Sequence, residues 1–160
     1  LDSHAINAIT AVLQNNKVLR QFYIRDPSLK AEVFFTFASA FEKNPSLKIT
    51  QIDWSENNVD EKTVLTLASN LPAFVNGLTH LNLAGCGLST KAVVALVKAL
   101  EAHDKTCQSL SHLNLAGNKI DAEGSKVLST LFAKTVKLTE LCLAAGNVDF
   151  HLLKKLETLQ

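Results

Sequence analysis

The chain has 160 residues, of which 47% are hydrophobic, and its formal net charge at pH 7 is +1. This is enough apolar material for one hydrophobic core, so we expect a globular protein rather than a disordered one. A net charge so close to zero argues against nucleic acid or an anionic membrane as the ligand. No apolar run approaches the roughly 20 residues that span a bilayer, so we expect no direct membrane insertion.

Helices and short strands are predicted to alternate along the whole chain. Helices are inferred from apolar residues spaced three and four apart, and strands from short alternating segments. Asp2 or Ser3, Asp60 and Asp149 are candidate helix caps, while the polar segment 103–109 is predicted to be a loop. In chain order the predicted elements are helix 1–14, strand 21–24, helix 30–43, strand 51–54, helix 60–71, a strand around Leu81, helix 90–102, a strand around Leu113, helix 121–134, strand 138–143 and a final helix from Asp149.

One eleven-residue motif recurs at these strands. Residues 78–88 and 110–120 both fit the pattern L-x-x-L-x-L-x-x-(N/C)-x-L, and looser copies begin at Leu19, Ile49 and Leu138. The first residues of the five copies, at 19, 49, 78, 110 and 138, are 28 to 32 positions apart. A fixed period of this length indicates a solenoid in which each repeat is one strand followed by one helix.

The pattern resembles the ribonuclease-inhibitor-like class of leucine-rich repeats. One strand-helix unit cannot bury its own apolar face, so stacking is required for a continuous core. We therefore predict an α/β horseshoe arc with parallel strands on the concave face and helices on the convex face. We expect residues 1–160 to form a single domain of five repeats and a leading half-repeat, within a longer protein.

Three residues occupy the N/C position of the motif with side chains able to bond neighbouring turns: Asn57, Cys86 and Asn118. Asparagine can donate to backbone carbonyls that the bend leaves unpaired, and cysteine can do so weakly. Pro27 and Gly146 stand at this position in the first and last copies and lack such a donor. We interpret the three residues as a structural ladder along the arc.

Alternate side chains of each strand should point away from the core onto the concave face. This face is predicted to bind a protein, with Tyr23 and Arg25 as anchors, because aromatic and arginine side chains carry much of the energy at protein interfaces. The candidate binding residues are Tyr23, Arg25, Gln51, Asp53, Ser55, His80, Asn82, His112, Asn114 and Glu140.

A metal site is the alternative for part of this face. His80, His112 and Glu140 fall at one level of neighbouring strands, with Cys142 close by, and all are metal-ligand types. Side chains at equivalent positions of parallel strands point in parallel instead of converging, so we favour a solvated polar ladder. We likewise interpret Asp53, Asn82 and Asn114 as a hydrogen-bonded row.

No catalytic motif is present. The sequence has no phosphate-binding glycine loop, no G-x-S-x-G and no H-E-x-x-H, and we interpret Cys107 as an idle thiol in a polar loop. Three cysteines without C-x-x-C spacing argue against both a disulfide framework and structural zinc, and favour a reducing, intracellular setting. We expect no enzyme activity, no cofactor, no bound metal and no small-molecule substrate.

The order of the motifs resembles the repeat domain of the CARMIL family of actin capping-protein regulators. The resemblance covers residues 44–155 and rests on these segments: 44–47, 52–59, 77–83, 110–118 and 149–153. It implies a cytoplasmic, cytoskeleton-associated scaffold of actin filament assembly with actin-regulatory protein partners. The parts with which that family grips capping protein are absent here, so capping-protein binding is assigned to no residue.

Three other functions remain open from the sequence. One is a GTPase-activating protein of the nuclear-transport type, which shares the repeat class. Another is a metallohydrolase built on His80, His112 and Glu140. The third is an interaction protein outside the actin system, such as an effector or an innate sensor.

Overall fold

The computed structural model describes residues 1–143. The predicted final helix from Asp149, and the repeat positions Gly146 and Val148, lie outside the described residues.

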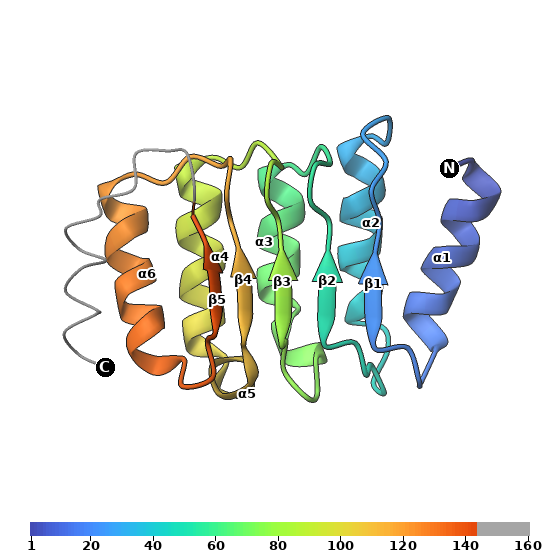
Figure 1. Ribbon diagram of the computed structural model, residues 1–160. Coiled ribbons are helices and arrows are strands. Elements are labelled where there is room, and N and C mark those ends of the chain that lie inside the picture. The colour runs from blue at the N-terminus through green and yellow to red at the C-terminus, as the bar shows by residue number, and fades with distance from the viewer. Residues whose placement is uncertain (144–160) are drawn as a thin grey trace.

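Helices and strands alternate along the described chain in a single row (Figure 1). The strands lie side by side in one layer, and the helices cover one face of that layer. The elements are α1 (Ser3–Asn15), β1 (Gln21–Tyr23), α2 (Ala31–Phe41), β2 (Gln51–Asp53), α3 (Glu61–Ser69), the 3-10 helix η1 (Leu71–Ala73), β3 (His80–Asn82), α4 (Thr90–Ala102), α5 (Asp104–Ser109), β4 (His112–Asn114), α6 (Ala122–Lys134) and β5 (Glu140–Cys142).

The sheet has five strands in the order β1-β2-β3-β4-β5, and every neighbouring pair is parallel. The register aligns equivalent repeat positions, since Leu81 pairs with Ile52 on one side and with Leu113 on the other. Each long helix packs against the helix of the next repeat, α1 on α2, α2 on α3, α3 on α4 and α4 on α6. The predicted α/β leucine-rich-repeat arc is confirmed.

Helix starts follow the chemistry of the capping residues. The carboxylates of Asp2, Asp60 and Asp121 accept from the backbone N–H three residues later, and the Ser89 hydroxyl does the same for α4. Such caps satisfy donors that the first helical turn leaves free. Of the predicted caps within the described residues, Asp60 is confirmed, and Asp2 rather than Ser3 caps α1.

The core runs the length of the arc and changes character along it. In the C-terminal part, leucines and valines of β3, β4, α4 and α6 fill it. In the N-terminal part, six aromatic side chains pack edge to face or stacked in one cluster, in which the fully buried indole of Trp54 contacts three of the phenylalanines. They are Phe22, Phe34, Phe37, Phe41, Trp54 and Phe74. The aromatic rings supply the volume that paired leucines provide in the other repeats.

The side chains at the N/C position bond across the repeats, at the turns that follow the strands. Asn57 Nδ2 donates to Ile24 O at 2.7 Å, and Asn118 Nδ2 donates to Leu83 O at 2.7 Å. Asn118 Oδ1 also accepts from Leu88 N. Cys86 Sγ lies 3.1 Å from Trp54 O, and its burial raises the pKa of the thiol to about 11, which keeps it protonated and able to donate.

A second pair of buried asparagines bonds across the repeats at the opposite rim, where each helix returns to the next strand. Asn44 Nδ2 donates to Leu13 O and Asn16 O, and Asn70 Nδ2 donates to Ala38 O. The sequence analysis assigned no cross-repeat role to these residues, because an asparagine after a helix is also an ordinary end signal. Both rims of the arc are therefore held by side-chain amides.

The prediction for segment 103–109 was wrong. The segment was predicted to be a polar loop, but Asp104–Ser109 form α5, and Cys107 is buried with Sγ 3.2 Å from Leu100 O. The short helix is fixed by tertiary contacts: the buried Thr106 hydroxyl accepts from Leu78 N, and Ser109 Oγ donates to Leu78 O. The 3-10 turn at Leu71–Ala73 was also not predicted, although Pro72 does stop α3 as expected.

Among residues 1–143, no helix combines the length and the apolar character needed to cross a membrane.

Candidate functional site

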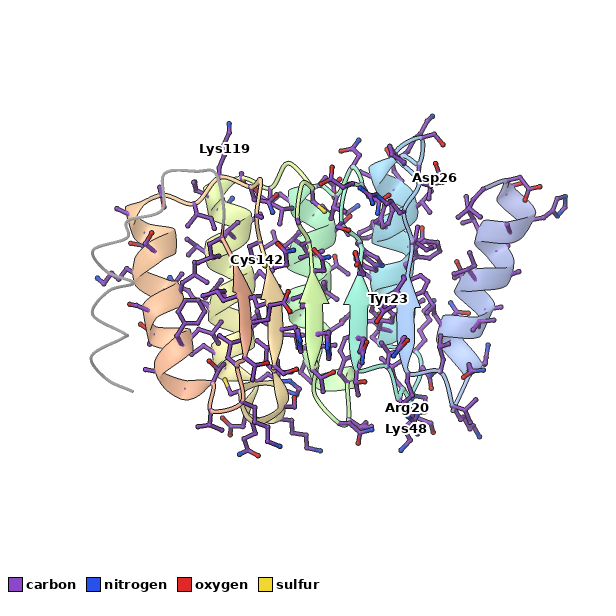
Figure 2. All side chains as sticks on the ribbon, in the orientation of Figure 1. Arg20, Tyr23, Asp26, Lys48, Lys119 and Cys142 are labelled. Atoms are coloured by element: carbon purple, nitrogen blue, oxygen red, sulfur yellow. The ribbon has the colours of Figure 1, made fainter. Side chains whose placement is uncertain are left out.

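The concave face consists of the strand side chains that point away from the helices. At its N-terminal end Tyr23 is 56% exposed, and its hydroxyl donates to Gln51 Oε1 on the neighbouring strand. Figure 2 shows Tyr23 on β1, at the open side of the sheet. The phenol ring is therefore held by one polar contact while most of its surface remains available to a partner.

A polar row crosses the middle of the concave face. Asp53 Oδ1 accepts from the backbone N–H and the hydroxyl of Ser55, and Asp53 Oδ2 accepts from Asn82 Nδ2 at 3.0 Å. Asn114 Oδ1 accepts from Ala116 N at 3.1 Å, which repeats the local turn of Asp53 and Ser55 two strands further along, after β4. These side chains shape the strand ends as well as the surface.

Two histidines stack beside this row. The rings of His80 and His112 lie with centroids 4.0 Å apart and planes 10° from parallel, as their aligned register on β3 and β4 requires. His112 Nε2 lies 3.5 Å from Glu140 Oε2 on β5, a contact that is an ion pair only when the ring is protonated. The ladder along neighbouring strands thus brings the two imidazoles and the carboxylate together.

Hydroxyls behind the histidines fix the ring orientation. Thr79 Oγ1 lies 2.8 Å from His80 Nδ1 and donates to Thr50 O, and Ser111 Oγ lies 2.7 Å from His112 Nδ1 and donates to Thr79 O. Since each hydroxyl hydrogen is used on a carbonyl, we infer that Nδ1 carries the ring proton of each neutral imidazole, which leaves Nε2 of His80 as an acceptor. The sequence analysis did not identify Thr79 and Ser111, though each directly precedes its histidine.

The protonation of His80 is disfavoured by its surroundings. Partial burial lowers the pKa of His80 below its ordinary value of 6.5, the neighbouring His112 lowers it further, and Glu140 opposes the shift. A neutral His80 ring presents a polar, uncharged surface near neutral pH. Such a surface can accept a hydrogen bond from a partner through Nε2.

The concave face carries a hollow of about 150 Å³, lined by side chains from β1 to β5 including Tyr23, Asp53, His80, His112 and Glu140. Pockets that enclose small ligands are typically about 300–1,000 Å³, so this hollow is small for one. Within the described residues no three His, Cys, Asp or Glu side chains are grouped so as to hold a metal ion. The arrangement offers a flat mixed surface to a macromolecule.

Two of the predicted binding residues, Arg25 and Ser55, lie beyond the ends of the strands. Arg25 is exposed in the turn after β1, while Ser55, Ala84 and Ala116 are half-buried in the equivalent turns. Ala144 lies outside the described residues. The structure thus brings Tyr23, Gln51, Asp53, His80, Asn82, His112, Asn114 and Glu140 onto one continuous face, with Arg25 and Ser55 at its rim.

Comparison with known proteins agrees with this architecture. A family model described as Leucine Rich repeat matches residues 78–97 and 106–129. Rho GTPase-activating protein gacW of Dictyostelium discoideum is 29% identical over 96% of this chain, and Protein CARMIL of the same organism is 29% identical over 83%. The human capping protein, Arp2/3 and myosin-I linker protein 3 is 25% identical over 96%. The chain spans only 14%, 13% and 11% of these relatives.

Solved structures show the same fold at lower identity. The leiomodin-1 actin-binding site 2 domain superposes with a TM-score of 0.74 and 16% identity, over 96% of this chain and 87% of that one. The tropomodulin C-terminal domain of Caenorhabditis elegans gives 0.70 and 12%, over 95% and 91%. The resemblance to CARMIL that the sequence analysis found on residues 44–155 is confirmed by the relatives.

Proposed function

Since this chain is a leucine-rich-repeat domain that resembles the repeat domain of CARMIL proteins, we propose that it is a non-enzymatic protein-interaction scaffold in a regulator of actin filament assembly. We further propose that it acts in the cytoplasm, associated with the cytoskeleton, and that residues 1–160 are one domain. Its partners on this proposal are actin-regulatory proteins, bound through the concave face.

The concave face is the observation that supports this proposal most strongly. It is continuous over five strands, has mixed polarity, and carries a hollow of about 150 Å³ at its centre, which suits a protein surface better than a small substrate. Tyr23 provides an exposed aromatic anchor at one end, and Arg25 provides a guanidinium beside it. Two relatives are named for capping protein or CARMIL, which supports the actin system as the setting.

The relative named as a Rho GTPase-activating protein supports a second role for the same fold. This chain spans 14% of that protein, so GTPase activation can reside elsewhere in it. We propose that the repeats contribute recognition there also, and that the isolated chain does not accelerate GTP hydrolysis. Single-turnover hydrolysis by a panel of small GTPases, with and without the chain, tests this, and an accelerated rate for any of them would contradict it.

The scaffold proposal is tested by affinity capture from cytosol with a concave-face triple variant, Tyr23→Ser, Arg25→Ser and Gln51→Ser. These positions leave the Asp53 and Asn82 hydrogen bonds intact, so the turns after the strands are preserved. The matched control replaces three exposed residues of the helical face, Lys62→Ser, Leu65→Ser and Lys98→Ser.

The proposal predicts that the wild-type chain and the control retain the same actin-regulatory proteins, identified by mass spectrometry, and that the concave-face variant loses them. If the wild-type chain, the control and the concave-face variant all retain the same partners, the concave face is not the binding surface. Retention of partners that all lie outside actin assembly would remove the actin setting.

A further inference from the structure

Basic residues of this chain are concentrated on one rim of the arc. All strands are parallel, so the loops that enter them share one rim and the loops that leave them share the other. The entering loops carry six basic residues and two acidic ones: Lys17, Arg20, Lys43, Lys48, Lys105 and Lys137, against Glu42 and Asp104. The near-zero net charge of the whole chain conceals this basic rim.

The basic residues of this rim are largely unpaired. Within the described residues no ion pair engages Lys17, Arg20, Lys43, Lys48 or Lys137, while Lys105 Nζ donates to the backbone carbonyl of Val75. Lys48 is half-buried and the other four are exposed. Figure 2 shows Arg20 and Lys48 at the lower edge of the view, and Asp26 and Lys119 at the opposite edge.

Two solvent-exposed aliphatic side chains lie on the same rim. Val18 is 73% exposed and Val136 is 79% exposed, the two highest values among large hydrophobic residues in the described part of the chain. Val18 follows Lys17 in the loop before β1, and Val136 precedes Lys137 in the loop before β5. Each end of the rim therefore presents one aliphatic group beside a lysine. The two ends are about 19 Å apart, since four strand spacings of about 4.8 Å separate β1 from β5.

We propose that this basic rim docks the protein onto the surface of an anionic phospholipid bilayer. Lysine ammonium groups would lie at the lipid phosphates, and the two valines would enter the interfacial region. A bilayer is flat and extended, so it can meet both ends of the rim together. The chain would lie on the membrane without spanning it.

The composition of the rim favours lipid over an acidic protein partner. Five of its six basic residues are lysines, which are depleted at protein interfaces, whereas arginine and aromatic side chains are enriched there. Lysine acts on phosphate as a point charge without the bidentate geometry that carboxylate recognition exploits. This inference is independent of the proposed scaffold role, and it leaves the concave face, on a different side of the strands, free for a protein.

Co-sedimentation of the 160-residue chain with phosphatidylserine-rich vesicles, and with vesicles of phosphatidylcholine alone, tests the proposal. We expect partition onto the anionic vesicles only, weakened by added salt. Each charge contributes about fivefold near an anionic surface, so Lys17→Gln, Lys43→Gln and Lys137→Gln together should lower the partition coefficient roughly a hundredfold. Val18→Ser with Val136→Ser should lower it while the salt dependence remains.

The matched control, Lys30→Gln, Lys98→Gln and Lys119→Gln, removes the same charge away from the rim and should bind close to wild type. Circular dichroism confirms that each variant is folded. Absence of wild-type binding, or equal losses in the rim variant and the control, would overturn the proposal. Rim-dependent retention on polyglutamate resin without vesicle binding would also overturn it, and would assign the rim to an acidic protein instead.

Discussion

Single buried asparagine side chains stabilise the boundary between adjacent repeats. Asn118 is 5% exposed, and its side chain bonds Leu83 O and Leu88 N across the boundary between two repeats and Leu115 O within its own repeat. Removing the amide leaves buried backbone groups without partners, and each such group costs about 1–3 kcal/mol.

We therefore expect Asn118→Ala to lower the free energy of unfolding by about 3 kcal/mol. Urea unfolding followed by the fluorescence of Trp54, the single tryptophan of the chain, measures this. The control is Asn58→Ala, at an exposed position, which should change stability by less than about 0.5 kcal/mol. Equal effects of the two substitutions would show that the cross-repeat hydrogen bonds are not the cause.

Two histidines, His80 and His103, give the free energy of unfolding a dependence on pH. The pKa of His80 is lowered in the folded state by burial and by His112, and burial also lowers the pKa of His103. As pH falls through about 6.5, the unfolded chain therefore takes up these protons before the folded chain does. The free energy of unfolding is expected to be higher above this pH and to decrease on acidification toward the lower folded-state values.

Replacing His80 with Gln should make this decrease smaller, while the contribution of His103 remains. Thermal unfolding at a series of pH values from 7.5 to 5.5, about one unit either side of the ordinary histidine pKa, compares the two proteins. Parallel curves for wild type and His80→Gln would contradict the assignment of this proton uptake to His80.

At the scale of elements, the loop that enters β3 lies directly against α5. Gly77 has φ +71° and precedes β3, and a Cβ there would lie 2.6 Å from the backbone carbonyl of Lys105 in α5. Gly87 has φ +69° in the turn after β3, and a Cβ there would meet nothing within 4 Å. The two glycines thus share a backbone conformation but differ in their neighbours.

We expect Gly87→Ala to cost about 1 kcal/mol, the strain of a left-handed residue. Gly77→Ala should cost clearly more, about 3 kcal/mol, because the methyl group also displaces α5 from the loop before β3. Chemical denaturation of both variants measures the difference. Equal destabilisation would mean that α5 is not held closely against that loop.

Much of the element order could be predicted from the sequence, because leucines and helix caps repeat with a fixed period. The short helix α5 could not, since Asp104–Ser109 has no apolar periodicity and owes its conformation to contacts of Thr106 and Ser109 with Leu78. Similarly, the residues on the concave face follow from strand alternation alone. Their hydrogen bonds could not be predicted in this way. The contacts of the Thr79 and Ser111 hydroxyls with the rings of His80 and His112 depend on the folded positions of these side chains.

At the scale of the whole molecule, an arc of parallel strands gives four separate surfaces, two faces and two rims. The concave face presents aromatic and polar side chains, the helices cover the other face of the sheet, and the two rims differ in charge. A scaffold built this way can contact a membrane by its basic rim and a protein by its concave face at the same time. This arrangement would orient the bound protein relative to the bilayer.

The central claim is that the concave face is the surface that meets a protein partner. The direct test places the photo-cross-linking residue p-benzoylphenylalanine at position 23, in place of exposed Tyr23, or at position 65, in place of exposed Leu65 on α3. After irradiation in cytosol, the account predicts a covalent adduct with an actin-regulatory protein from position 23 and none from position 65. An adduct formed from position 65 alone would contradict it.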